Sequence, residues 1–572
     1  MSQNHFGERN KPSLKKGEFT VSFETRKLEV TLLAAEKTLQ LPLIKDHYWF
    51  LDDIRDNFYY AMHLYAATQD DRIQLSRERE AAKRLAEMVL INSIKLQDQD
   101  SKSPMFGHWP LSLYPEPLGA EKNTLPVEFF GSLLLHFYEK YKGTFSKELH
   151  VEINNALSTI YHSNLKDRVP ELFNHHETKI FVIQLMFGQF FHDDTMKNNG
   201  YYHLKALYHH LTEYGLREYG ALPWLWHRIQ SLTFAHDYIQ DEPIKQTLTD
   251  LLNYFWKERA AFYLKGAWVG SHSRGLPHDI SKDDNTLIDY IQFGDFPMPS
   301  SISRLEGAGF LSYQVPDSIL ELALNHDQPV EIKKQIRLFS EEEKKEREDL
   351  HHYVYITSSY AIGGMWDRTE EYLNEQHRWD ISLPVEHNDT INQVYFFHPG
   401  EGYHSSMEDG RHQSSNSEVL FHKNVVCALY YDLPKKTQLI VGYLPNGEWL
   451  KDEKNLYGKV GEVYFSIHLS NPISLIEKES HLLVKSYGNT NGVVIEVLTG
   501  HEIKTLNIRN LAEFKNYMGI FKVDFGFKGG DEMVINYKTT QGESLELKYD
   551  SSREKVTRLI DDQEIIFKDY KL

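Results

Sequence analysis

The strongest constraint on the fold is a change in hydrophobic spacing near residue 350. From about residue 46 to 265 the apolar residues recur with the spacing of amphipathic helices, most clearly over 77–96. After residue 350 the pattern changes to short β-branched and aromatic runs that are separated by turn signals. The sequence therefore predicts a helical region followed by an all-β region.

The helical region is expected to contain a series of eight helices. They are predicted at 48–66, 77–96, 127–141, 147–161, 176–192, 200–216, 223–238 and 243–263. Two weaker helices are predicted at 317–325 and 335–349. The connection 98–123 and the irregular segment 266–305 are rich in Pro, Gly and aromatic residues, which favours ordered functional loops.

The β region is expected to form an antiparallel β-sandwich. About ten strands are predicted, and pairs such as Asn446-Gly447 between them suit tight hairpins. A chain of 572 residues is too long for one ordinary hydrophobic core. We therefore expect a lead-in over 1–45, a helical domain over 46–349 and a β-sandwich domain over 350–572.

The charge and the cysteine content restrict the possible partners. A net charge of −19 argues against nucleic acid and anionic membranes, although a local cluster of Arg and His can still bind an anionic substrate. The first twenty residues lack a secretory h-region and no apolar run could span a bilayer, so a cytoplasmic protein is expected. The single cysteine, Cys427, forbids an internal disulfide and a CxxC zinc site.

The chain has no common metal, nucleotide or nucleophile motif, so its candidate site residues are side chains in loops that can transfer protons or bind sugars. The segment 192–203 is expected between two helices. Its Asn198 and Asn199 amides can hydrogen-bond a carboxyl group, and Tyr201 can move a proton. The alternative is an ordinary helix-capping loop, because Asn and Gly are common cap residues.

A second candidate is the glycine-flanked segment 270–275. Arg274 can grip an anion with its guanidinium, while His272 can take or give a proton. The alternative is an exposed loop in which Arg274 pairs with a nearby aspartate.

Further candidates are aromatic and polar side chains near loops or helix starts. The aromatic group could stack on sugar rings, although tryptophans at helix starts more often belong to a core. These residues are Trp109, Trp224, Trp226 and His227 in the helical region, and Tyr360, His404, Arg411, His412 and Gln413 in the β region.

The combination resembles the heparinase II/III-like polysaccharide lyases, which have an α/α toroid followed by an antiparallel β-sandwich. The resemblance covers most of the chain, and the fragments that carry it are GSHSRG at 270–275, YITSSYAIGG at 355–364 and HQSSNSEVLFHKNVVCALYYDLP at 412–434. It implies β-elimination on a uronic-acid-containing glycan. In such lyases the carboxylate is neutralised, a Tyr or His removes the C5 proton, and the bond to the 4-oxygen breaks.

The resemblance also implies roles for the candidate residues. Asn198 or Asn199 and Arg274 would neutralise the carboxylate, and His272 would be the base. Tyr201 or Tyr360 would donate or accept a proton. The tryptophans, His227 and the polar residues 404–413 would bind the substrate, an anionic oligosaccharide or polysaccharide. No cofactor is required, although the Asp-rich segments could hold a structural divalent cation.

Two other functions stay open. One is a glycoside hydrolase on a related toroid, with a carboxylate pair drawn from Glu128, Asp193, Asp194, Glu218 and Glu306. The other is a non-catalytic carbohydrate-binding protein that uses the β region. For an enzyme, we expect the active site in a cleft between the two regions, where the segments 192–203, 270–275 and 404–413 would meet.

Overall fold

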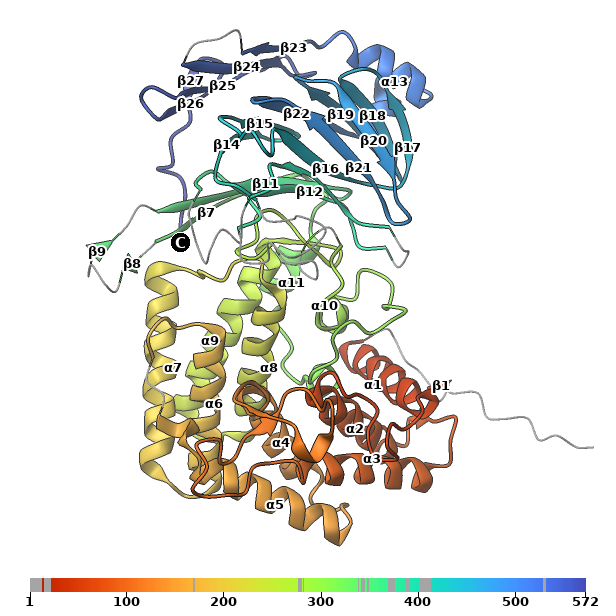
Figure 1. The fold of residues 1–572 in the computed structure, drawn as a ribbon, viewed down its shortest axis with the longest axis vertical. Helices are drawn as coiled ribbons and strands as arrows, with labels where there is room; N and C mark the ends of the chain where they lie inside the picture. Colours follow the sequence, from red (N-terminus) through yellow and green to blue (C-terminus); the bar gives the residue numbers. More distant parts are fainter. Residues whose placement is uncertain are drawn as a thin grey trace, which may run out of the picture.

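The computed structural model describes a helical half and a β half, which lie one above the other in Figure 1. The described residues are 13–14, 22–167, 170–275, 280, 282–337, 339–340, 345–346, 349–368, 376–386, 390–400, 413–527 and 531–572. Within this part of the chain, none of the helices combines the length and the apolar composition needed to cross a membrane.

In the part of the chain that the structure describes, the helical half has nine long helices, with two shorter ones after them. The long helices are α1 Phe23–Gln40, α2 Ile54–Gln69, α3 Arg79–Ile94, α4 Leu125–Tyr141, α5 Lys147–His162, α6 His175–Phe190, α7 Asp194–Tyr214, α8 Leu222–Tyr238 and α9 Glu242–Ala261. The shorter ones are α10 Leu287–Gln292 and α11 Asp317–Leu324. All eight predicted helices and the weak one at 317–325 are present. The helix α1 is an addition, because it lies within the expected lead-in.

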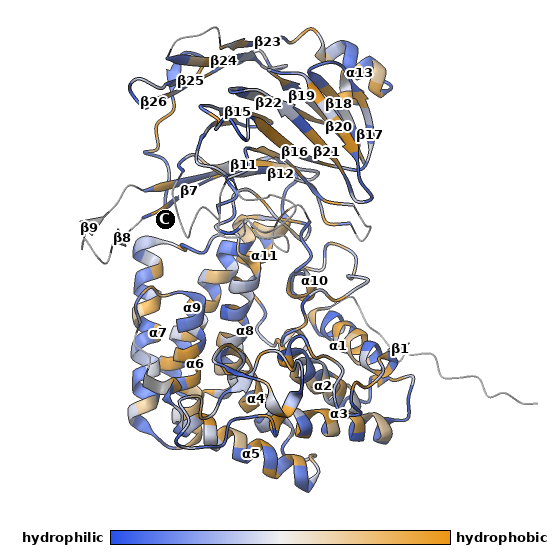
Figure 2. Ribbon diagram, viewed as in Figure 1, coloured by the Kyte–Doolittle hydropathy of each residue, from blue (hydrophilic) through white to orange (hydrophobic). Residues whose placement is uncertain are grey.

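Burial divides the long helices into inner and outer members. Nearly every residue of α2, α4, α6 and α8 is buried up to the last turns. The outer helix α7 buries one stripe at helical spacing, formed by Met196, Gly200, Leu204, Leu207 and Leu211. Hydrophilic and hydrophobic turns accordingly alternate along α5 and α7 in Figure 2. This arrangement is an α/α toroid.

The segment that follows α10 bridges the first and last inner helices. The Gly307 N–H donates to Oε1 of Gln230 on α8 at 2.7 Å, and the Gly309 N–H donates to Nε2 of His63 on α2 at 2.9 Å. The 3₁₀ helix η3, Ala308–Phe310, packs on α1. These contacts join α8 to α2 and so hold the two ends of the helical series together.

In the described residues, the β half contains three large antiparallel sheets and the two-stranded sheet β8-β9. The eight-stranded sheet has the order β20-β21-β16-β13-β12-β11-β10-β7, the six-stranded sheet β14-β15-β22-β19-β18-β17 and the five-stranded sheet β23 to β27 in sequence. The bounds are β7 Val330–Ile336, β10 Leu350–Ile356, β11 Ala361–Met365, β12 Trp379–Ser382, β13 Gln393–Phe397, β14 Ser417–His422, β15 Val425–Tyr430, β16 Leu439–Pro445, β17 Glu448–Lys451, β18 Asn455–Val460, β19 Val463–Leu469, β20 Ile473–Glu477, β21 His481–Tyr487, β22 Asn491–Thr499, β23 Val523–Gly526, β24 Glu532–Lys538, β25 Ser544–Asp550, β26 Lys555–Ile560 and β27 Gln563–Glu564.

Two local predictions for this region are wrong. The expected helix at 335–349 is absent in the described residues, where β7 ends at Ile336 and β8, Phe339–Ser340, pairs with β9, Lys345–Glu346. Pairing of β7 with β10 decides the structure here, and it places the first strand of the sheet before residue 350. The Asn446-Gly447 turn is not a hairpin, because it connects β16 and β17, which belong to different sheets.

The toroid and the sandwich have separate hydrophobic cores. The toroid core gathers residues from α1 to α11 and reaches β10 through residues such as Leu350 and Val354. The sandwich core contains Cys427, whose side chain is buried. The eight-stranded sheet is the layer that faces the toroid (Figure 1).

Candidate active site

The inner helices α2, α4, α6 and α8 begin at the same end of the toroid. The His175 ring at the start of α6 stacks on Trp224 near the start of α8, and His176 bonds Glu128 near the start of α4. Arg55 at the start of α2 lies in the electrostatic range of Glu306, which is bound to α8. Helix N-termini carry partial positive charge, so this convergence favours an anionic ligand.

The first group at this end is a histidine held by a carboxylate. Nδ1 of His176 donates to Oε2 of Glu128 at 2.5 Å, and Nζ of Lys179 lies 3.4 Å from the same oxygen. The Glu128 and Lys179 side chains are buried, whereas 34% of the His176 side chain is exposed. Because Nδ1 is committed to Glu128, a neutral His176 presents an unprotonated Nε2, which can accept a proton.

The second group is a stack of rings beside His176. The His175 ring centroid lies 4.0 Å from that of His176 and 4.5 Å from that of Trp224, and Cζ of Arg274 lies 4.4 Å from the Trp224 centroid. Burial lowers the pKa of His175 to about 3, so this ring is neutral near pH 7. The stack links His176 to Arg274.

Glu218 fixes the position of the His175 ring in this stack. Its carboxylate accepts from Nδ1 of His175 at 2.8 Å and from Nη2 of Arg228 at 2.6 Å. Burial opposes ionisation of Glu218, but His175 and Arg228 outweigh it and hold the pKa of the carboxyl below its usual value. Glu218 is therefore ionised at neutral pH.

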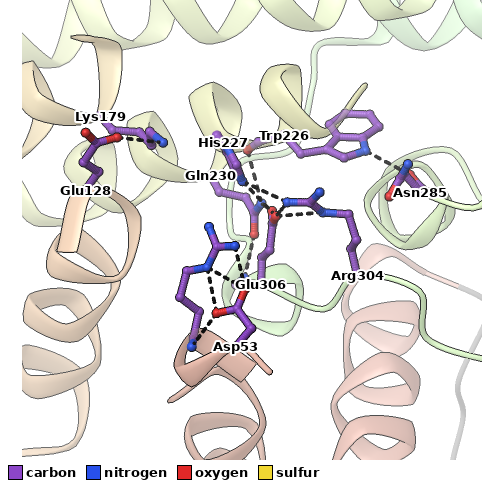
Figure 3. A network of polar contacts seen from close by, with 11 residues as sticks. Asp53, Glu128, Lys179, Trp226, His227, Gln230, Asn285, Arg304 and Glu306 are labelled. Carbon is purple, nitrogen blue, oxygen red and sulfur yellow. Dashed lines mark hydrogen bonds and ion pairs between the residues drawn. The ribbon is translucent and has the colours of Figure 1, made fainter. Parts of the chain in front are cut away.

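The third group surrounds Glu306 (Figure 3). Its Oε1 lies 2.8 Å from Nε2 of His227 and 2.6 Å from Nη2 of Arg304, and its Oε2 accepts from Nε2 of Gln230 at 2.8 Å. Burial raises the pKa of Glu306, but the contacts with His227 and Arg304 lower it by more, so the pKa of this carboxyl is below its usual value. These contacts hold Glu306 in a left-handed backbone conformation with φ of +45°.

A fourth group stands at the start of α2. Asp53 caps the helix and accepts from Nε of Arg55 at 3.0 Å and from its Nη2 at 2.6 Å. Asp56 follows one turn later on the same side. Burial, reinforced by the neighbouring charge of Asp53, raises the pKa of Asp56 to about 6.

A separate buried cluster lies where the toroid meets the sheet. Nε2 of His272 lies 3.6 Å from Oδ2 of Asp380 on β12, and Nε2 of His377 lies 3.3 Å from it. The backbones of His272 and His377 exchange two hydrogen bonds of 2.9 Å. Gln413 reaches Nδ1 of His377 at 2.7 Å. The side chains of His272, His377 and Asp380 are fully buried, so this cluster joins the two halves and does not face solvent.

The structure brings together only some of the predicted site residues. Arg274, Trp224 and His227 belong to the groups at the helix starts. His272 and Gln413 lie in the buried cluster, where His272 has no exposed surface from which to act as a base. The Trp224 ring is already in contact with the His175 ring and the Arg274 guanidinium, so its role is to position these two side chains.

Other predicted residues lie away from these groups. The segment 192–203 is mostly helix, because Asp193 caps α7 and the helix continues through it. Asn198 and Asn199 are exposed on this outer helix, and Tyr201 donates to the Pro243 carbonyl at the start of α9. The capping alternative is wrong for Asn198, Asn199 and Gly200 as well, because these residues lie inside α7 and cap neither of its ends.

Three aromatic candidates are core residues. Nε1 of Trp109 donates to the Ser93 carbonyl, Nε1 of Trp226 to the Asn285 carbonyl, and Oη of Tyr360 to the Val497 carbonyl. All three side chains are almost fully buried, because their rings fill space between packed elements. His404, Arg411 and His412 lie outside the described residues.

Sequence reasoning missed His175, His176, Arg55 and Arg304. A signal for the histidines was present, because Asn174 and Glu177 form a capping box that places both in the first turn of α6. Among the described residues, no group of three or more His, Cys, Asp or Glu side chains is arranged to hold a metal ion.

No protein-family model matches the sequence, and no curated protein is similar to it in sequence. Among solved structures, the chondroitin AC lyase of Streptomyces coelicolor A3, determined with chondroitin sulphate, aligns with a TM-score of 0.50 and 9% identity over 94% of this chain and 86% of that one. The chain has the fold of this lyase. Heparinase III aligns with a TM-score of 0.45 and 10% identity over 95% and 94% of the two chains, and a chondroitinase AC lyase with 0.44 and 9% over 96% and 99%.

The likeness confirms the predicted architecture of an α/α toroid followed by an antiparallel β-sandwich. At this level of identity it establishes the fold alone. The activity has to be argued from the side chains.

Proposed function

We propose that the protein is a polysaccharide lyase that cleaves a uronic-acid-containing glycan by β-elimination, with its active site at the starts of α4, α6 and α8. The observation that carries the proposal is the partly exposed His176, whose Nδ1 is fixed by buried Glu128. A carboxylate that holds one imidazole nitrogen sets the tautomer and makes the other nitrogen a base.

The neighbouring groups suit the charge that this reaction creates. Removing the C5 proton places negative charge on the uronate carboxyl, and positioned donors stabilise it most effectively. Arg274, held over Trp224, would bind this carboxylate, and the N-terminal ends of the inner helices add partial positive charge. His176 would take the C5 proton. The C4=C5 double bond then forms as the C4–O4 bond breaks, and the leaving O4 takes a proton from water, which gives a new hydroxyl end and an unsaturated uronate.

The hydrolase alternative needs one carboxyl group that is protonated as the general acid. Glu218 and Glu306 are both kept ionised by arginine partners, so neither is suited to this task. Asp193 is occupied by capping α7 and by the Tyr161 hydroxyl. These observations favour the lyase.

The proposal is tested by incubating the protein with a panel of uronate-containing glycans and recording the ultraviolet absorbance of the unsaturated product. His176→Ala is expected to lower kcat by about 100-fold or more, which is the usual effect of losing a general base. His209→Ala, which removes an exposed histidine from the outer helix α7, is the matched control and should keep wild-type turnover.

Three outcomes would contradict the proposal. Release of reducing ends without the absorbance would indicate hydrolysis. Binding of glycans without turnover would indicate a carbohydrate-binding protein. Full activity of the His176→Ala enzyme would remove this residue from the mechanism.

A further inference from the structure

Lys179 lies one turn after His176 on α6 and contacts the same carboxylate oxygen. Nδ1 of His176 lies 2.5 Å from Oε2 of Glu128, and Nζ of Lys179 lies 3.4 Å from that atom (Figure 3). Residues three apart on a helix lie on one face, so both side chains reach Glu128 of α4 from the same side. The Glu128 and Lys179 side chains are buried, so water and salt screen this contact little.

The contact with Glu128 has a cost for a histidine that acts as a base. A buried negative charge bonded to Nδ1 favours the doubly protonated imidazole, which has no electron pair on Nε2 with which to remove a proton. The neighbouring rings do not oppose this effect. Burial lowers the pKa of His175 to about 3 and that of His227 to about 4, so both are uncharged near pH 7. A positive charge close to Glu128 is needed to keep His176 unprotonated.

Lys179 is the cation that contacts this carboxylate on α6. Burial lowers the pKa of Lys179 from its ordinary value of 10.5, while Glu128 raises it because the carboxylate stabilises the ammonium. Glu306 also raises this pKa, and Arg55 on α2 lowers it. An amine is ordinarily a stronger base than an imidazole, so the charge of Glu128 favours the proton on Lys179 over a second proton on His176.

We propose that Lys179 is a positioning residue that keeps the pair of His176 and Glu128 in its basic form. Its ammonium offsets the charge of the carboxylate, so Glu128 fixes the Nδ1–H tautomer of His176 without adding a proton to Nε2. The inference rests on the proposed lyase function only where it names the C5 proton of a uronate as the proton that His176 removes.

The first test follows the protonation of His176 without a substrate. Diethylpyrocarbonate acylates unprotonated imidazole, and the partly exposed His176 can be monitored in digested peptides by mass spectrometry. Lys179→Met replaces the amine with a neutral side chain of similar length. We expect the pH of half-maximal modification of His176 to rise by about 1–2 pH units, the effect of removing one nearby charge. An unchanged midpoint would overturn the inference, because Lys179 would then carry no charge that acts on His176.

Three controls separate the charge from other effects of the substitution. Lys179→Arg keeps the positive charge and should keep the wild-type midpoint of His176. Lys334→Met removes another buried lysine that is paired with a glutamate, Glu258, and should also keep it. The exposed His209 on α7 is modified in the same samples, and its midpoint should be the same in every protein. A midpoint of His176 that rises as much in Lys334→Met as in Lys179→Met would contradict the assignment to Lys179.

The second test uses turnover. The acid limb of kcat/KM against pH reports the base of the free enzyme, so it should move to higher pH in Lys179→Met by the same amount as the modification midpoint. At pH values above the limb, kcat/KM should be close to that of the wild type. A loss of rate at every pH, with the limb unmoved, would show a structural role only and overturn the inference. If no glycan yields the unsaturated product, the proposed function fails, while the modification midpoint still decides the role of Lys179.

Discussion

At the scale of single residues, the buried charges fall into two kinds. Glu306 is held ionised by Arg304 and His227, and these contacts also keep its backbone at a φ that non-glycine residues rarely adopt. Asp283 is equally buried, but among the described residues its hydrogen bonds go to Asn392 alone, an uncharged amide. The difference decides which carboxyl remains charged at neutral pH.

Asp283 is expected to make stability depend on pH. Burial raises the pKa of its carboxyl to about 7 in spite of the nearby His272, from an ordinary value of 3.8. The folded state therefore binds a proton between about pH 4 and 7 that the unfolded state has lost, and stability falls as the pH rises through this window. Asp283→Asn should remove this loss and be more stable than wild type at pH 8 by up to about 4 kcal/mol, because each pH unit of this window costs about 1.4 kcal/mol.

Urea unfolding at pH 5 and pH 8 measures this effect. Asp327→Asn, at an exposed position, serves as the control. Removing a solvated carboxylate should change the free energy of unfolding by the same amount at pH 5 and at pH 8. An Asp283→Asn protein that loses as much stability between pH 5 and 8 as the wild type would show that Asp283 is not the group responsible.

At the scale of elements, α6 and α7 are held together by a close approach of their backbones. A Cβ atom on Gly200 would lie 2.5 Å from the Leu185 backbone nitrogen, and one on Gly188 would lie 2.3 Å from that of Lys197. Gly200 therefore serves helix packing, while Asn198 and Asn199 lie on the exposed face of α7. These residue types are shared by helix caps and by ligand loops, so the sequence alone could not separate these uses.

Gly200→Ala is expected to destabilise the toroid by about 1–3 kcal/mol, because α7 must move away from α6 to admit the methyl group. Asn199→Ala, one position earlier on the exposed face, should change stability by less than about 0.5 kcal/mol and leave turnover at the wild-type level. Thermal unfolding of the two variants gives the comparison. A large loss of activity in Asn199→Ala would return this residue to the candidate site.

The helices were predictable because their hydrophobic spacing is local. The strand β7 was missed because its sequence is rich in charged residues and is held as a strand by pairing with β10, which a local sequence pattern does not show. The site was partly predictable for the same reason. Arg274 and Trp224 stand beside Gly and Pro signals that mark loops and helix starts, whereas the use of His176 depends on Glu128 from another helix. Such a pairing follows from packing and has no signature in the order of residues.

At the scale of the whole molecule, the loop that carries Arg274 belongs to the joint between the toroid and the sandwich. Oδ1 of Asp380 accepts from the Gly270 N–H at 3.2 Å and from the Ser382 hydroxyl at 3.0 Å, while its Oδ2 faces His272 and His377. One fully buried carboxylate thus ties the start of the loop to the sheet. The sandwich contributes to the site by fixing this loop.

Asp380→Ala is expected to destabilise the protein by about 3–5 kcal/mol, because it removes the carboxylate that faces two buried imidazoles and leaves the Gly270 N–H and the Ser382 hydroxyl without their acceptor. It should also raise KM more than it lowers kcat, since Arg274 is held less firmly, while His176 and Glu128 lie on α6 and α4, with which Asp380 forms no hydrogen bond or ion pair among the described residues. Asp380→Asn retains an acceptor oxygen for the Gly270 N–H, so it should lose less stability and raise KM less than Asp380→Ala does. Urea unfolding and steady-state kinetics on the same samples separate the two effects, and an Asp380→Ala protein with unchanged stability and unchanged KM would show that the cluster does not couple the two halves.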